Sequence, residues 1–172
     1  MAKKDFSKGK MKEKIIWAPW RIKYIAGKKE KGCLFCRVKK ENKDKENYLL
    51  LRGKYCFVML NKFPYNNGHL MIAPYRHIKG ISQLKEKEVI ELWELVNLSV
   101  KILKKTLKPE GFNIGINSGK VAGAGFPGHL HIHLVPRWNG DTNFMPVVAK
   151  QKVISQSLEE LYQELAKLLQ KK

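Results

Sequence analysis

The apolar residues of this chain fall into several short runs and two longer stretches of helical period. Short runs rich in apolar, aromatic and β-branched residues, separated by turn residues, are typical of strands. These runs predict strands over residues 48–51, 55–60, 69–73, 112–117 and 129–135. The tripeptide Arg52-Gly53-Lys54 fits a tight turn between the first two strands.

The two longer stretches repeat their apolar residues at the period of an α-helix. They predict an amphipathic helix over residues 82–107, with Ser82 as its N-cap, and a C-terminal helix over residues 158–169. Strands, a helix, strands and a helix in this order favour an α+β domain with a mostly antiparallel sheet. We predict a single domain over residues 15–172, after a flexible basic tail over residues 1–14.

Composition narrows the class of protein. Hydrophobic residues make up 44% of the 172 positions, which is enough for a substantial core. No apolar run approaches the roughly 18 residues that span a bilayer. The charged N-terminus also lacks the apolar stretch of a signal peptide. We therefore expect a cytoplasmic protein that has no contact with membranes.

The charge balance favours an anionic partner. The chain has 34 lysines and arginines against 15 acidic residues, a net charge of +19. Such an excess suits nucleotide phosphate, nucleic acid or anionic lipid. It is nearly all lysine, however, and is spread along the chain, so general solubility is an alternative and nucleic acid is not the favoured partner.

Three of the five histidines alternate along one predicted strand, as His129, His131 and His133. Side chains two apart on a strand share a face, so the three imidazoles would point the same way. Imidazole suits proton transfer near neutral pH, nucleophilic attack and metal binding. Neighbouring histidines at this spacing are roughly 7 Å apart at Cα, which is awkward for three ligands of one ion. The pattern thus favours catalysis over a structural or metal-binding row.

Residues 129–135 resemble the histidine triad family, whose pattern is His-φ-His-φ-His-φ-φ with φ apolar. The resemblance extends over about residues 17–148. The opening Trp-Ala-Pro-Trp-Arg at residues 17–21, the Ala-Gly-Ala-Gly loop and residues 138–144 are most similar to the branch that contains diadenosine tetraphosphate phosphorylases and related hydrolases.

The resemblance implies cleavage of a dinucleoside polyphosphate such as diadenosine tetraphosphate. His131 would attack an α-phosphorus and form a nucleotidyl-histidine, while a carbonyl near His129 accepts a hydrogen bond from its other nitrogen. His133 would stabilise or protonate the leaving group. Water as acceptor gives a hydrolase and phosphate gives a phosphorylase. The alternatives are a nucleoside phosphoramidate hydrolase and a non-catalytic, zinc-stabilised nucleotide- or RNA-binding module.

The family also implies residues that bind the substrate, and a homodimer. Asn61 matches a position that binds ribose hydroxyls, and the glycine-rich loop before the triad could direct backbone N–H groups at phosphate. This loop lacks the Gly-Gln-Ser or Gly-Gln-Thr of many members. The candidate substrate ligands are Asn61, Phe63, His69, Asn117, Ser118 and Gly125, each of which also has a structural interpretation as a turn, strand-end or core residue. Trp93 and Leu98, outside the main stripe of the long helix, are candidates for a dimer interface, although core packing explains most of that stripe.

The cysteines suggest a metal site. Three cysteines, an odd number, argue against a disulfide framework, and Cys33 and Cys36 form a C-x-x-C. Tetrahedral zinc needs two more ligands. The resemblance to zinc-binding bacterial members supplies His77 and His129, which predicts a structural zinc. The alternatives are a thioredoxin-like redox site, whose βαβ context is missing here, and reduced, metal-free cysteines.

Overall fold

The computed structural model describes residues 32–141 and 154–169. The predicted basic tail, the tryptophan-rich segment at residues 17–21 and residues 142–144 lie outside these ranges. Within the described part of the chain, no helix is long and apolar enough to cross a membrane.

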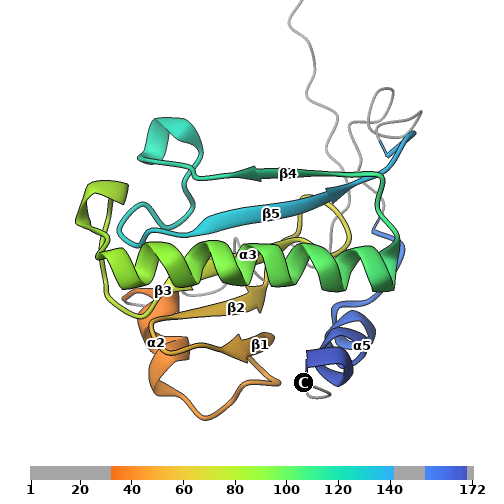
Figure 1. The fold of residues 1–172 in the computed structure, drawn as a ribbon, viewed down its shortest axis with the longest axis horizontal. Helices are drawn as coiled ribbons and strands as arrows, with labels where there is room; N and C mark the ends of the chain where they lie inside the picture. The colour runs from red at the N-terminus through yellow and green to blue at the C-terminus, as the bar shows by residue number, and fades with distance from the viewer. Residues whose placement is uncertain (1–31, 142–153, 170–172) are drawn as a thin grey trace, which may run out of the picture.

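A five-stranded antiparallel sheet forms the centre of the fold, with the strand order β1-β2-β3-β5-β4 (Figure 1). The strands are β1 (Leu49–Arg52), β2 (Cys56–Leu60), β3 (Leu70–Pro74), β4 (Gly111–Gly115) and β5 (Ile132–Arg137). The predicted α+β class with an antiparallel sheet is confirmed.

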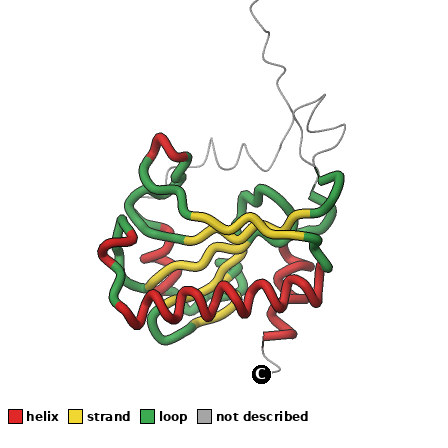
Figure 2. Tube along the Cα trace, turned by 45° about the horizontal axis from the view of Figure 1, so that its top comes forward, coloured by secondary structure: helices red, strands yellow, loops and turns green. Residues whose placement is uncertain are grey.

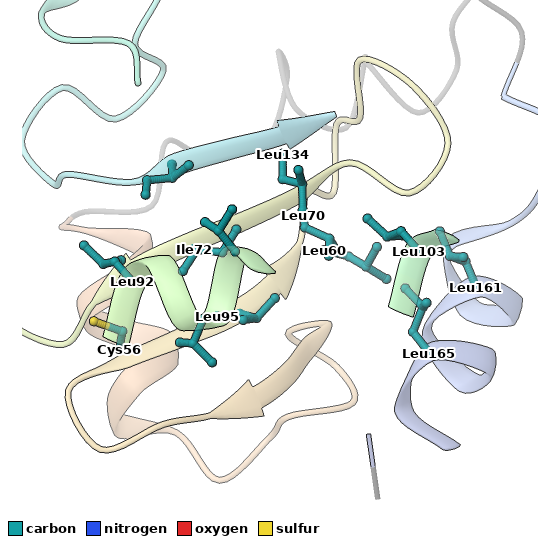
Figure 3. Packing of buried hydrophobic residues seen from close by; sticks show 13 residues of the cluster. Cys56, Leu60, Leu70, Ile72, Leu92, Leu95, Leu103, Leu134, Leu161 and Leu165 are labelled. Carbon is teal, nitrogen blue, oxygen red and sulfur yellow. The ribbon is translucent and has the colours of Figure 1, made fainter. Parts of the chain in front are cut away.

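Helices cover both faces of this sheet. The long helix α3 (Glu86–Leu107) runs across one face, as Figure 2 shows, and α5 (Leu158–Leu169) packs beside it. Alternate residues of β2 and β3 join these helices in one apolar cluster, in which Leu134 of β5 also lies (Figure 3). The short helix α2 (Leu34–Lys40) packs on the remaining residues of β2 and β3, in a second cluster. The central strands β2 and β3 are therefore buried on both faces, whereas β4 is half-buried to exposed.

The long helix begins four residues later than the sequence predicts. Ser82 lies in a 3-10 turn, η1 (Ile81–Gln83), and the α-helix begins at Glu86. The Gln83 side chain accepts the backbone N–H of Lys79 at 2.8 Å, which holds the turn. The Glu88 carboxylate accepts the N–H of Lys85 at 2.8 Å and thus closes the true N-terminus of the helix.

Two strand boundaries and one short helix also differ from prediction. The strand predicted over residues 129–135 begins only at Ile132, because the N–H of Leu130 bonds to the carbonyl of Ile78 at 2.6 Å instead of joining the ladder. The predicted strand over residues 112–117 ends at Gly115. Helix α2, which begins inside the C-x-x-C, was not predicted, since seven residues are too few for a clear helical period.

Candidate active site

His131 lies just before β5, 4% exposed, on the sheet face opposite α3. Its Nδ1 is 2.8 Å from the backbone carbonyl oxygen of His129, the hydrogen bond that the sequence analysis expects. A carbonyl can only accept, so Nδ1 carries the proton and Nε2 keeps its lone pair. Burial lowers the pKa of His131, although the hydrogen bond to His129 opposes this shift. The ring is therefore a neutral imidazole with one nitrogen free to act as a nucleophile.

An aromatic side chain, that of Phe35, packs against the rings of His129 and His131. The ring of Phe35 lies 5.0 Å from that of His129 and 4.8 Å from that of His131, between centroids. Phe35 and Leu60 are fully buried, so they are core residues and do not line an open slot for a purine. Phe63, a candidate substrate ligand, is half-buried in the β2–β3 loop.

His133 stands beside the proposed nucleophile, with 4.7 Å between its ring centroid and that of His131. Its Nδ1 lies 2.9 Å from Nε2 of His69. Its Nε2 is buried and has no hydrogen-bond partner among the described residues. Buried polar atoms are rarely left unpaired, so this nitrogen is a site for a ligand atom.

His69 is wholly enclosed, and protein groups engage both of its ring nitrogens. Its Nδ1 receives the backbone N–H of Tyr65 at 3.0 Å and the amide nitrogen of Asn61 at 3.3 Å, while Nε2 faces His133. The Asn61 carbonyl accepts the N–H of Phe63 at 2.9 Å. The candidate residues Asn61 and His69 thus meet each other, and His69 has no exposed surface for a substrate.

The remaining candidates lie in the connection from β4 to β5, which contains the 3-10 turn η2 (Lys120–Ala122) (Figure 1). Gly119 and Gly123 flank this turn with φ of +85° and +86°, a conformation that glycine adopts without strain. Asn117 is half-buried beside Gly123, and both Ser118 and Gly125 are exposed. A role of this loop in substrate binding stays a prediction.

Tyr65 is a residue that the sequence analysis missed. Its side chain is 54% exposed, and its ring centroid lies 4.8 Å from that of His69 and 5.9 Å from that of His133. An exposed aromatic ring beside the buried His69 and the half-buried His133 offers a surface for stacking. The sequence feature that could have indicated Tyr65 is its position in the loop before β3, four residues from His69.

The two cysteines and two of the histidines gather at the start of α2. One ligand atom from each of Cys33, Cys36, His77 and His129 lies within 4.8 Å of the others. His77 Nδ1 is 3.3 Å from both Cys36 Sγ and His129 Nδ1. His129 Nδ1 is 3.3 Å from Cys33 Sγ and 3.7 Å from Cys36 Sγ. Tetrahedral zinc with bonds of about 2.0–2.3 Å separates its ligand atoms by roughly 3.3–3.8 Å. The four distances above fall in this range, so the two cysteines and two histidines are a donor set that suits zinc.

The tautomer of His129 suits a metal ligand as well. Its Nε2 lies 2.9 Å from the carbonyl oxygen of Pro74, so Nε2 carries the proton and Nδ1 presents its lone pair to the cluster. Both ring nitrogens of His129 are therefore committed, and the residue is 2% exposed. Its ring therefore has no nitrogen left for a substrate, and its contact with His131 is made through its backbone carbonyl.

We expect the neutral histidine pair to make the protein sensitive to acid. Burial lowers the pKa of His69 to about 3 and that of His133 to about 4. An unfolded histidine titrates near 6.5, so below that pH the unfolded state takes up protons that the folded state refuses. Stability should fall by about 1.4 kcal/mol per pH unit for each histidine as the pH drops from about 6.5 towards 4. Thermal melts of wild type and His69→Gln over this range would check it, and equal slopes would contradict the part assigned to His69.

Comparison with known proteins identifies the family. A model of the HIT domain matches residues 42–140. The chain belongs to the histidine triad (HIT) family. It is 36% identical over 160 residues to an AP-4-A phosphorylase of Mycobacterium tuberculosis, an alignment that covers 88% of this chain and 82% of that protein.

Solved structures of HIT proteins share the fold. A Zn-bound histidine triad family protein from Mycobacterium smegmatis superposes with a TM-score of 0.64 at 22% identity, over 81% of this chain and 94% of that chain. A histidine triad nucleotide-binding protein from Sulfolobus tokodaii gives a TM-score of 0.63 at 25% identity, over 81% and 93% of the two chains. These neighbours confirm the α+β fold of the HIT family for this protein.

Proposed function

We propose that this HIT protein cleaves dinucleoside polyphosphates, with diadenosine tetraphosphate as the substrate to test first. The observation that carries the proposal is the neutral ring of His131, whose Nδ1 is held by the His129 carbonyl while Nε2 is left as a nucleophile. The similarity to an AP-4-A phosphorylase supports the choice of substrate.

In the first step of the proposed reaction, His131 Nε2 would attack an α-phosphorus of the substrate. An N–P bond forms, and the bond from phosphorus to the bridging oxygen breaks, so that ATP leaves with the electron pair. The positive charge that develops on the ring is stabilised through Nδ1–H by the His129 carbonyl. The Nε2 of His133, which has no hydrogen-bond partner among the described residues, would hydrogen-bond an oxygen of the leaving group.

In the second step, an acceptor oxygen attacks the nucleotidyl-histidine and frees His131. Phosphate as acceptor releases ADP, and water releases AMP. The relative's name favours phosphate, and the acceptor can be read from the products. We expect ATP and ADP, formed only when phosphate is added; ATP and AMP without phosphate would identify a hydrolase. The absence of any product would overturn the proposal, and a parallel assay with an adenosine phosphoramidate tests the alternative substrate.

The basic surface fits an anionic substrate better than specific nucleic-acid recognition. Arginine supplies much of the base-specific contact in nucleic-acid complexes. Each of the four described arginines instead forms an ion pair with a carboxylate, in the pairs Arg37–Glu41, Arg52–Asp44, Arg76–Glu88 and Arg137–Asp141. The positive charge outside such pairs is mostly lysine, which attracts polyphosphate without selecting a sequence.

We infer a structural zinc in the Cys33, Cys36, His77 and His129 cluster. A site with four protein ligands is closed, so the ion would supply stability and no open coordination position for a substrate. It would join the start of α2 to the residues that precede β5. A cytoplasmic location, which suits free thiols, stays a prediction from the sequence.

We also propose a homodimer. Trp93 is 58% exposed on α3, next to the exposed side chains of Val89 and Ile90, while Leu98 is half-buried in a small apolar pocket and is not available. The outer edge of β4 has no neighbouring strand among the described residues. An apolar patch and a free strand edge are features that a two-fold interface covers.

Trp93→Glu is expected to convert the dimer to a monomer, because it would place a charge in an apolar interface. The dissociation constant should rise about 100-fold or more. Sedimentation velocity over a range of protein concentrations measures it. Lys104→Glu, about three turns further along the same helix, is the control for added negative charge. A wild-type protein that sediments as a monomer at every concentration would contradict the dimer.

A further inference from the structure

We propose that His69 is a positioning residue that locks His133 into the neutral tautomer with its proton on Nε2. His133 would then act on the substrate only as a hydrogen-bond donor and not as an imidazolium acid. The proposal rests on the proposed function for the identity of the substrate oxygen that accepts this hydrogen bond. The tautomer itself follows from the protein alone.

The tautomer of His69 is determined by the backbone N–H of Tyr65, which can act only as a donor. A backbone N–H can only donate, so the N–H of Tyr65, 3.0 Å from His69 Nδ1, requires a lone pair on that nitrogen. The amide of Asn61 adds a second donor at 3.3 Å. Its orientation is fixed in turn, because its carbonyl accepts the N–H of Phe63 at 2.9 Å. With Nδ1 committed as an acceptor, the proton of His69 stands on Nε2.

The proton on His69 then determines the state of His133. His69 Nε2–H donates to His133 Nδ1 across 2.9 Å, so His133 Nδ1 must hold a lone pair. A proton on that nitrogen would face the His69 proton directly, which excludes both the other neutral tautomer and the imidazolium. The remaining proton of His133 stands on Nε2, the buried nitrogen without a partner among the described residues.

The direction of these hydrogen bonds, from Tyr65 through His69 to His133, determines what His133 can do for a substrate. A neutral N–H donor can stabilise negative charge on a departing phosphate oxygen, but it does not transfer a proton to it. A polyphosphate leaving group departs as an anion and needs no such transfer. The substrate class that this arrangement favours is therefore one whose leaving group is a phosphate, rather than one that must gain a proton as it leaves.

The tautomer can be read without any substrate. In protein labelled with ¹⁵N-histidine, a two-bond ¹H–¹⁵N correlation spectrum at neutral pH distinguishes protonated from bare ring nitrogens, and the chain has only five histidines. We expect His133 as a single species with the proton on Nε2, and His133→Gln identifies its signals. A proton on His133 Nδ1 in the wild type would overturn the proposal, whether or not the protein turns over diadenosine tetraphosphate.

Two variants of His69 distinguish a role in orienting His133 from a role in filling the buried site. His69→Phe fills the site but offers no donor, so His133 should populate both tautomers and kcat for diadenosine tetraphosphate should fall about tenfold or more. His69→Gln retains a carbonyl for the N–H of Tyr65 and an amide N–H for His133, so it should keep the single tautomer and most of kcat. Equal behaviour of the two variants in both measurements would refute the lock. If His69→Phe does not fold, the wild-type spectrum and His69→Gln still decide the question.

Discussion

His131→Asn is expected to abolish turnover of diadenosine tetraphosphate, with a loss on the order of 10⁴-fold or more in kcat. Asparagine has no ring nitrogen in the place of Nε2, the atom that would bond to phosphorus. Its side-chain amide is still able to donate to the His129 carbonyl, which now accepts His131 Nδ1–H at 2.8 Å. The pocket should therefore keep its shape, and the substrate should still bind.

Three measurements test this expectation together. Quenched-flow assays should show an adduct of one nucleotidyl group on the wild type, detected as a mass increase under acid-free denaturing conditions, and none on His131→Asn. Calorimetric titration should give similar dissociation constants for both proteins. Unchanged melting temperature and metal content would establish that the variant is folded. Full activity of His131→Asn would exclude the covalent mechanism.

Loss of one cysteine from the metal cluster is expected to have the second large effect. Cys36→Ser should lower the zinc content from about one per chain to well below that and should cost several kcal/mol of stability, because metal binding contributes directly to folding. Atomic absorption and thermal melts measure the two effects. Cys36 Sγ lies 3.3 Å from His77 Nδ1 and 3.7 Å from His129 Nδ1, so it contacts both histidines of the cluster.

Cys56 provides the matched control for this prediction. It is fully buried among apolar residues on the other side of the sheet, and burial raises the pKa of its thiol to about 12. Cys56→Ala should therefore leave the zinc content unchanged and cost only the packing of one small side chain. Wild-type protein purified with little zinc, or a Cys36→Ser variant that retains it, would argue for metal-free cysteines instead.

The strands could be predicted to within a few residues because their signal is local. Short apolar runs placed β2 and β3 almost at their observed bounds. Ile132 and Leu134, which alternate with the histidines, lie in the apolar cluster on the face of α3. The start of α3 could not be predicted in this way. It depends on the side chains of Gln83 and Glu88 bonding back to the backbone, and such bonds leave no periodic trace in a sequence.

The residues of the candidate site also differ in whether a local sequence signal reveals them. The alternating histidines are visible in the sequence. The ligands of the metal cluster, in contrast, come from distant positions such as Cys33, His77 and His129, and their spacing along the chain does not show that they lie close together in the fold. Only the resemblance to a family joined them in advance. The family resemblance also placed His69 near the substrate, whereas protein groups engage both of its ring nitrogens, so we propose that it acts on the substrate only through His133.

His129 serves two neighbours through different parts of one residue. Its imidazole faces the cysteines, and its main-chain oxygen holds His131. Any replacement at position 129 deletes the first link and leaves the second atom in place. An inactive variant at position 129 would therefore indicate that the segment before β5 has moved, because the carbonyl that accepts the hydrogen bond is still present. Restoring activity would then require another crosslink that holds this segment in place.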